Sequence, residues 1–172
     1  MTQSAGPLHP APYGHEPVGL DEISFNMDIV GGVVGSLCEV YRELTRLDAA
    51  GHRVNFWFDH ETDAVAVQSP YTHDCLAVRV KQPAPLFVRF PTWVDAPSVT
   101  VNGIAGTPRH QNGYLFIADP PLDQPISFNF ELPTREVTLN HRTRRIRARM
   151  RGDEVLAMDN FGANLTYFDP YE

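Results

Sequence analysis

The segment Arg53–Asp59 reads RVNFWFD and begins a change of pattern in the chain. From Val54 on, every second side chain in it is valine or phenylalanine. Successive side chains of a β-strand point to opposite faces, so this alternation predicts a strand with one buried face. The pattern recurs in LAVRV, LFVRF and ISFNF, which begin at residues 76, 86 and 126. Alternation predicts a core of Val54, Phe56, Phe58, Leu76, Val78, Val80, Leu86, Val88, Phe90, Ile126, Phe128 and Phe130.

More short apolar segments surround these four and are separated by turn signals. They fall at 64–68, 98–101, 114–117, 137–139, 145–151, 155–158 and 165–168. Asn102-Gly103 and Asn112-Gly113 are strong turn dipeptides. Many short strands at a spacing of roughly 8–12 residues, without alternating helices, favour a sandwich over a parallel α/β sheet. The sequence therefore predicts an all-β fold: an antiparallel, jelly-roll-like β-sandwich preceded by one α-helix.

The one predicted helix covers about Asp28–Asp48, with Asp28 as N-cap and Gly51 as the stop. Its apolar stripe recurs every three or four residues, at Val33, Val34, Leu37, Val40, Tyr41, Leu44 and Leu47. Glycines at 31, 32 and 35 weaken its first turns, so a loop that becomes helical only near Val34 is the other interpretation. The expected organisation is a flexible Pro/Gly-rich tail (1–20), a lead-in helix (21–51) and a β-sandwich domain (52–172).

Charge, apolar content and cysteine spacing argue against several classes of protein. A net charge of −7 argues against nucleic-acid binding, which needs a basic face. No apolar run approaches the roughly 18 residues that span a bilayer, so no membrane partner is expected. The N-terminus has no basic region followed by an apolar stretch, which argues against a secretory signal. Cys38 and Cys75 form no ligand-like pair, which favours a cytoplasmic location.

No catalytic or metal-binding residue can be singled out, and no cofactor is expected. The cluster Asp59-His60-Glu61-Thr62-Asp63 carries metal-friendly side chains, but polar residues are also typical of a hairpin turn, and we favour the turn. Cys38 and Cys75 have no histidine nearby in sequence, and each is expected to be a small buried apolar residue.

An arginine row is the least ordinary stretch of the chain. In a strand, Arg145, Arg147, Arg149 and Arg151 point to one face and the apolar residues between them to the other. A solvated face paired with carboxylates of adjacent strands is the favoured interpretation, followed by a face that docks another domain or chain. A polyanion site ranks last, because the segment lacks interleaved aromatic residues.

Three aromatic residues are candidates for carbohydrate binding. Trp57, Trp93 and Tyr71 have amphipathic rings that could stack on sugars if they are exposed. The alternative, favoured for both tryptophans, is that they close one end of the core or are covered by the helix.

The order of these segments resembles the C-terminal part of β-L-arabinofuranosidase-like glycoside hydrolases, which are six-hairpin glycosidase-like enzymes. The resemblance covers about residues 28–168 and rests on loose strand patterns. It is carried by RVNFWFD at 53–59 with Ser69-Pro70, LFVRFPTWV at 86–94, Val101-Asn102-Gly103, Gly113-Tyr114-Leu115, Phe128–Pro133 and Arg151-Gly152-Asp153.

In that family a helical α/α barrel carries catalysis, and β-sandwich domains pack against it. A cysteine pair precedes the helix that leads into the sandwich, whereas the matching stretch here, residues 26–32, has no cysteine. The resemblance therefore implies a non-catalytic accessory domain that docks on a catalytic barrel or forms a homo-oligomer, and that hydrolyses no aryl glycoside alone. The alternatives are a carbohydrate-binding module and a glycoside hydrolase whose site is shared between subunits.

Overall fold

A computed structural model describes residues 33–141, 144–159 and 169–171. After helix α1 (Val34–Arg42), the strands form three sheets. The first sheet has the order β1 (Thr45–Asp48), β2 (Gly51–Val54), β6 (Leu86–Arg89), β9 (Tyr114–Ile117), β8 (Arg109–Gln111). The second has the order β3 (His60–Glu61), β4 (Val65–Gln68), β5 (Leu76–Val80), β10 (Pro125–Asn129), β7 (Thr100–Asn102). The third has the order β11 (Thr134–His141), β12 (Arg144–Arg151), β13 (Glu154–Met158), β14 (Asp169–Pro170).

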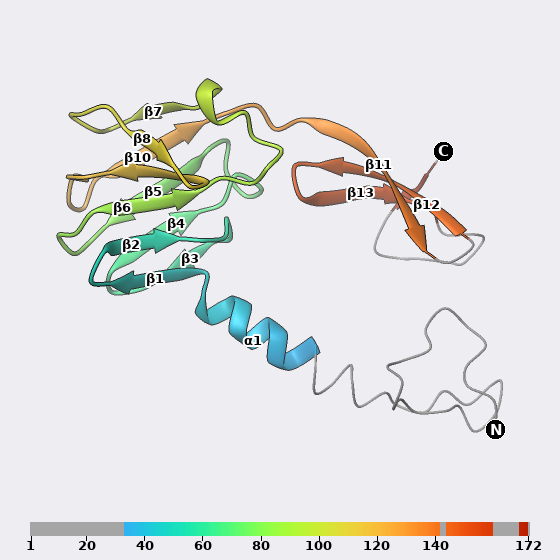
Figure 1. Ribbon diagram of the computed structural model, residues 1–172, viewed down its shortest axis with the longest axis horizontal. Helices are drawn as coiled ribbons and strands as arrows, with labels where there is room; N and C mark the ends of the chain where they lie inside the picture. Colours follow the sequence, from blue (N-terminus) through green and yellow to red (C-terminus); the bar gives the residue numbers. More distant parts are fainter. Residues whose placement is uncertain (1–32, 142–143, 160–168, 172) are drawn as a thin grey trace.

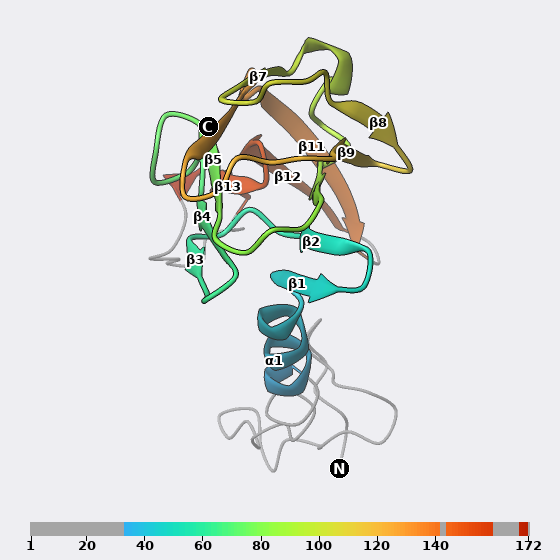
Figure 2. The ribbon, with the colours of Figure 1, turned by 90° about the vertical axis from the view of Figure 1, so that its left-hand side faces the viewer.

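The first two sheets pack face to face as a sandwich, and Figure 2 shows the two layers side by side. Neighbouring strands within them run antiparallel, except that β2 and β6 run parallel. The predicted all-β sandwich with one helix is therefore confirmed, with this one parallel pair inside it. Figure 1 shows the third sheet and α1 extending from the same side of the sandwich.

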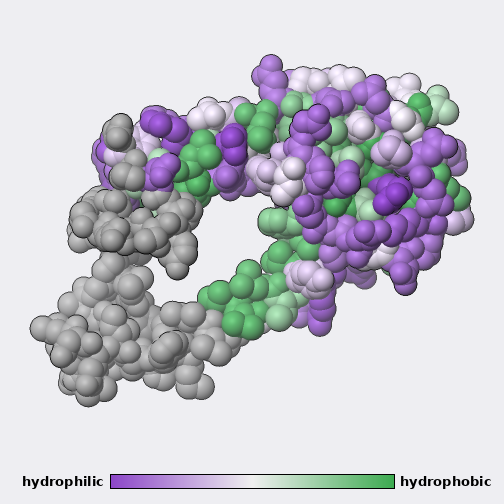
Figure 3. All heavy atoms as spheres, turned by 180° about the vertical axis from the view of Figure 1, so that it is seen from behind, coloured by the Kyte–Doolittle hydropathy of each residue, from purple (hydrophilic) through white to green (hydrophobic). Residues whose placement is uncertain are grey.

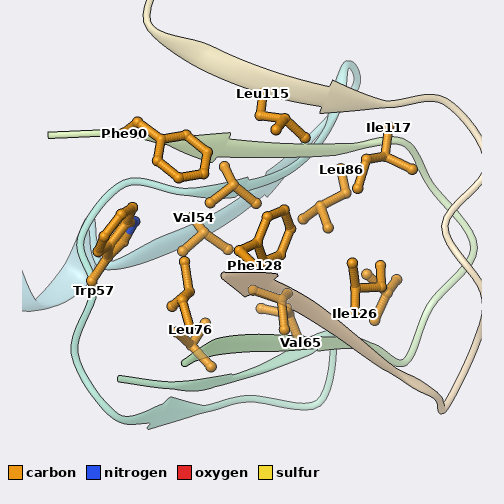
Figure 4. Packing of buried hydrophobic residues seen from close by; sticks show 14 of the residues in the cluster. Val54, Trp57, Val65, Leu76, Leu86, Phe90, Leu115, Ile117, Ile126 and Phe128 are labelled. Carbon is orange, nitrogen blue, oxygen red and sulfur yellow. The ribbon is translucent and has the colours of Figure 1, made fainter. Parts of the chain in front are cut away.

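The core lies between the two layers, where side chains of both sheets point toward one another (Figure 4). Alternation predicted most of it correctly: Val54, Leu76, Val78, Val80, Leu86, Val88, Phe90, Ile126 and Phe128 are buried. Phe130 and Phe56 are partly buried. The prediction is wrong for Phe58, which is 52% exposed.

The error at Phe58 arises because β2 ends at Val54. Beyond it the ladder becomes irregular, because the N–H groups of Asn55 and Phe56 both donate to the carbonyl of Leu44, at 2.9 and 3.4 Å. Once the strand has ended, the period of two no longer applies, and Trp57 enters the core in place of Phe58.

The helix is shorter than its apolar stripe predicts. Within the described residues it spans Val34–Arg42, so it ends six residues before the predicted Asp48, and its predicted start at Asp28 lies outside the described residues. Leu44 and Leu47 follow the helix; Leu47 belongs to β1, which pairs with β2. Gly51 therefore begins β2 and ends no helix. The sandwich accordingly begins at Thr45, ahead of the predicted boundary at residue 52.

Four short strands were not predicted, namely β1, β3, β8 and β14. The tail (1–20), the proposed N-cap Asp28 and the segment 165–168 lie outside the described residues. Among the helices that the structure describes, none is long and apolar enough to cross a membrane.

Candidate functional site

The candidate carbohydrate-binding aromatics lie at the end of the sandwich that faces the third sheet. Trp57 packs on Trp93, with ring centroids 5.7 Å apart, and on Phe130 at 4.8 Å. It is only 5% exposed, and its Nε1–H donates to the carbonyl of Arg89 at 2.8 Å. Its ring therefore offers no face to a sugar, and the structure removes Trp57 from the candidate surface.

Tyr71 and Trp93 are both partly buried and contact the turn between β12 and β13. The backbone N–H of Asp153 donates to the Tyr71 hydroxyl at 3.0 Å, across 82 residues of sequence. A Cβ on Gly152 would lie 2.9 Å from Trp93 Cζ2 and 3.0 Å from the Tyr71 hydroxyl oxygen. Only glycine fits so close an approach. These two aromatic residues therefore fix the third sheet to the sandwich.

The Tyr71 hydroxyl and the Trp93 indole N–H are the two polar groups in this contact between the aromatic residues and the Gly152 turn. Burial raises the pKa of Tyr71, so its phenol remains protonated at neutral pH and retains an O–H donor. The Trp93 Nε1 atom is buried and has no hydrogen-bond partner among the residues that the structure describes. Both groups are donors, and donors are what a sugar hydroxyl or a backbone carbonyl requires.

Asp59 holds the loop that carries Tyr71. Its Oδ1 accepts the Ser69 N–H at 2.6 Å, and its Oδ2 accepts the Thr72 hydroxyl at 2.7 Å. His73 Nδ1 lies 3.8 Å from Asp59 Oδ1. The hydrogen bond from Ser69, followed by that from Thr72, lowers the pKa of Asp59. The carboxylate is therefore a structural acceptor, and no group of metal-ligating side chains is found in the described part of the chain.

Replacement of Asp59 by asparagine is expected to weaken the acid dependence of stability. The folded-state pKa of Asp59 lies below its usual value of 3.8, so ionised Asp59 stabilises the fold above that pH. This contribution is lost as the pH falls from about 3.9 through the folded-state pKa. Urea unfolding of both proteins at neutral pH and below the folded-state pKa measures it. An equal loss of stability on acidification in the two proteins would contradict the assignment.

The arginine row lies on one face of β12, as alternation predicted. Three of its members meet carboxylates of their own chain: Arg147 with Asp159 at 2.9 Å, Arg149 with Glu136 at 3.9 Å, and Arg151 with Glu154 at 2.6 Å. The guanidinium of Arg147 also lies 4.3 Å from the ring centroid of Tyr171.

These three ion pairs agree with the favoured interpretation of the arginine row, a solvated face paired with carboxylates of adjacent strands. Hydrogen bonds from Arg147 lower the pKa of Asp159. Exposed ion pairs contribute about 0–1 kcal/mol each, so they neutralise the row more than they stabilise it. Arg145 is exposed, and docking through Arg145, Arg147, Arg149 and Arg151 stays a prediction.

Helix α1 carries an apolar surface that the sandwich does not cover. None of its residues is buried. Leu37 is 61% exposed and Tyr41 64%. Figure 3 shows the helix as a green stretch that leads away from the largely purple sandwich. The apolar spacing predicted this stripe, and the structure shows that the sandwich completes its core without it.

Sequence reasoning missed Gly152 and Asp59 as positioning residues. Gly152 entered the sequence analysis only within Arg151-Gly152-Asp153, and nothing in the sequence indicated that this segment contacts Tyr71 and Trp93. Comparison with known proteins adds no assignment: the chain matches no model of a protein family, and a search of curated proteins finds no match either.

Proposed function

We propose that this chain is a non-catalytic accessory β-sandwich domain that docks through helix α1 on a catalytic barrel of the β-L-arabinofuranosidase-like type. The observation that carries the proposal is the exposed apolar stripe of α1, defined by Val33, Val34, Leu37, Val40 and Tyr41. Contiguous exposed apolar surface commonly marks a protein interaction site. The resemblance in sequence supplies the class of partner.

A catalytic role for this chain has less support. Hydrolysis of a glycoside uses two carboxyl groups across a cleft, roughly 5–10 Å apart. Asp59, Glu154 and Asp159 are each engaged by donors of their own chain. A site shared between subunits would have to recruit other carboxylates.

A carbohydrate-binding module is the second candidate, because Tyr71 and Trp93 lie together and both are partly exposed. It ranks lower because Gly152 occupies the space between the two rings. Cys38 is exposed and Cys75 is partly buried, so the expectation that both are buried apolar residues is wrong. Both are free thiols, which suits the reducing cytoplasm in which we place the proposed complex.

Replacement of Leu37 by glutamate is expected to weaken binding to a catalytic barrel protein of this class at least about tenfold. Burial of a leucine side chain is worth about 1.5–3 kcal/mol, and tenfold in affinity corresponds to about 1.4 kcal/mol. Sedimentation velocity of mixtures at low and high salt measures binding. Glu39→Gln, on the polar side of the same helix, is the matched control and should bind like the parent chain.

Salt separates the two candidate docking surfaces. Contact through the apolar stripe should change little between low and high salt, whereas contact through the arginine row should weaken as screening shortens to about 3 Å at 1 M. Unchanged binding by Leu37→Glu, or binding that is lost at high salt, would contradict docking through the helix.

A further inference from the structure

Strand β11 is an eight-residue strand at the border of the third sheet. Its one described neighbour is β12. An edge strand presents unpaired N–H and C=O groups that can accept another strand. Proteins usually block such edges with lysine, proline or a bulge. The bulge of this sheet lies on the far side of β12, between Arg149 and Met150 where it pairs with β13.

The charges of β11 do not protect its second half. Arg135 donates to the carbonyl of Gly152 at 3.3 Å, which draws it toward the first end of the strand. Glu136 lies 3.9 Å from Arg149, its partner on the neighbouring strand β12. The remaining segment Val137-Thr138-Leu139-Asn140 has no charge and no proline, and Leu139 is 51% exposed.

We propose that β11 pairs antiparallel with β11 of a second copy of this chain, around a two-fold axis at Thr138. This goes beyond the function proposed above, because it uses a surface separate from helix α1. The third sheets of two copies would then form one continuous eight-stranded sheet.

The two faces of the sheet select the register. Opposite residues of an antiparallel pair share a face. Val137 and Leu139 lie opposite Ala148 and Ile146 on the apolar face, whereas Thr138 lies opposite Arg147 on the arginine face. With the axis at Thr138, Val137 meets Leu139 of the partner subunit, and the apolar face continues across the interface. Glu136 meets Asn140 of the partner subunit, so the two copies of Glu136 do not oppose each other.

Neighbouring registers are worse. An axis at Val137 would place Arg135 opposite Leu139 of the partner subunit. The apolar side chain of Leu139 would then face a charged guanidinium. An axis between Val137 and Thr138 would join the apolar face of one copy to the arginine face of the other, because a slip of one residue exchanges the faces.

The arginine rows of the two copies do not oppose this assembly. They would be separated by three strand spacings, about 14 Å, which exceeds the screening length of about 8 Å at physiological salt. Asp159, Glu136 and Glu154 already neutralise three of the four arginines within each copy.

A cross-link at the axis tests the register. In the full chain with Cys38→Ser and Cys75→Ser, Thr138→Cys should form a disulfide-linked dimer under mild oxidation. Opposite residues have Cα atoms about 4.5–5.5 Å apart, within the range of about 4.4–6.8 Å that a disulfide spans. Thr134→Cys is the matched control, because residues four positions from the axis are about 26 Å apart between the copies. A non-reducing gel should show the dimer for Thr138→Cys alone; no dimer, or equal dimer from both variants, would overturn the proposal.

Sedimentation velocity supplies the second measurement. The unmodified chain should be dimeric at micromolar concentration, and Leu139→Lys should make it monomeric by placing a charge at the joined edge. Leu122→Lys, at another exposed apolar position, should remain dimeric. Circular dichroism confirms that each variant is folded. A monomeric parent chain would overturn the proposal, as would a dimer that survives Leu139→Lys but is lost on Leu37→Glu, which would place the contact on the helix.

Discussion

Replacement of Phe128 by alanine is expected to lower the free energy of unfolding by about 3–5 kcal/mol, the usual cost of removing a buried phenylalanine. Phe128 is fully buried in the second sheet, between Leu76 of β5 and Val101 of β7. Its ring also meets Phe90 of the opposite sheet, with centroids 6.2 Å apart. The cavity left by alanine would therefore lie between both layers. Urea unfolding, followed by tryptophan fluorescence and circular dichroism, measures the loss.

Phe58 is the matched control for Phe128. It has the same side chain in a position that alternation also assigned to the core, yet it is 52% exposed. Phe58→Ala should change stability by no more than about 0.5 kcal/mol, as exposed substitutions do. Losses of similar size in the two variants would show that Phe58 is buried and that the described path of the chain after Val54 is wrong.

Replacement of Gly51 by alanine is the second change with a large expected effect. Gly51 has a φ of 136°, which side-chain-bearing residues rarely adopt. A Cβ there would overlap the carbonyl oxygen of Pro85, which accepts the His52 N–H at 2.8 Å. We expect a loss of about 2–6 kcal/mol, since backbone strain and overpacking each cost about 1–3 kcal/mol.

Gly106→Ala provides the comparison for Gly51. No atom lies within 4 Å of a Cβ at Gly106, so its substitution should leave stability nearly unchanged. Thermal unfolding of the two variants measures the difference. A Gly51→Ala variant as stable as Gly106→Ala would mean that β2 and β6 do not approach as described.

Alternation predicted the fold where a strand stays paired along its length. In β5, Leu76, Val78 and Val80 are buried as the period of two requires, because β4 and β10 flank the strand on both sides. Alternation failed where pairing stops. After Val54 the chain leaves the sheet, and the apparent strand that ends at Asp59 places Trp57 inside.

The spacing of apolar residues predicted too long a helix, because strand pairing takes over after Arg42. Leu44 and Leu47 continue the three-residue spacing of the helix, but Leu47 lies in β1, where pairing with β2 satisfies the backbone. Tertiary pairing therefore overrides a local pattern only one turn long. The parallel partner of β2 could not be predicted either, because alternation gives the face of a strand and says nothing of its neighbour.

In the candidate sites too, features set by the period of one strand were predicted, and features set by contacts between distant segments were not. The arginine row was placed on one face correctly, because that depends only on the period of a strand. Its ion pairs with Glu136 and Glu154 depend on the strands beside it. Contact of Tyr71 with the Gly152 turn joins segments 82 residues apart, and no local pattern encodes it.

The parallel pairing of β2 with β6 also constrains the order in which the chain folds. His52 lies opposite Leu86, and the intervening β3, β4 and β5 all belong to the other sheet. The hairpins of β3, β4 and β5 join residues close in sequence, so they can form early at little cost in loop entropy. The first sheet closes only when β6 returns to β2, across the stretch that holds these three strands. The second sheet in turn needs β7 and β10, which follow β6 in the chain, so neither layer can be completed from one continuous stretch of sequence and we expect the two layers to be completed together.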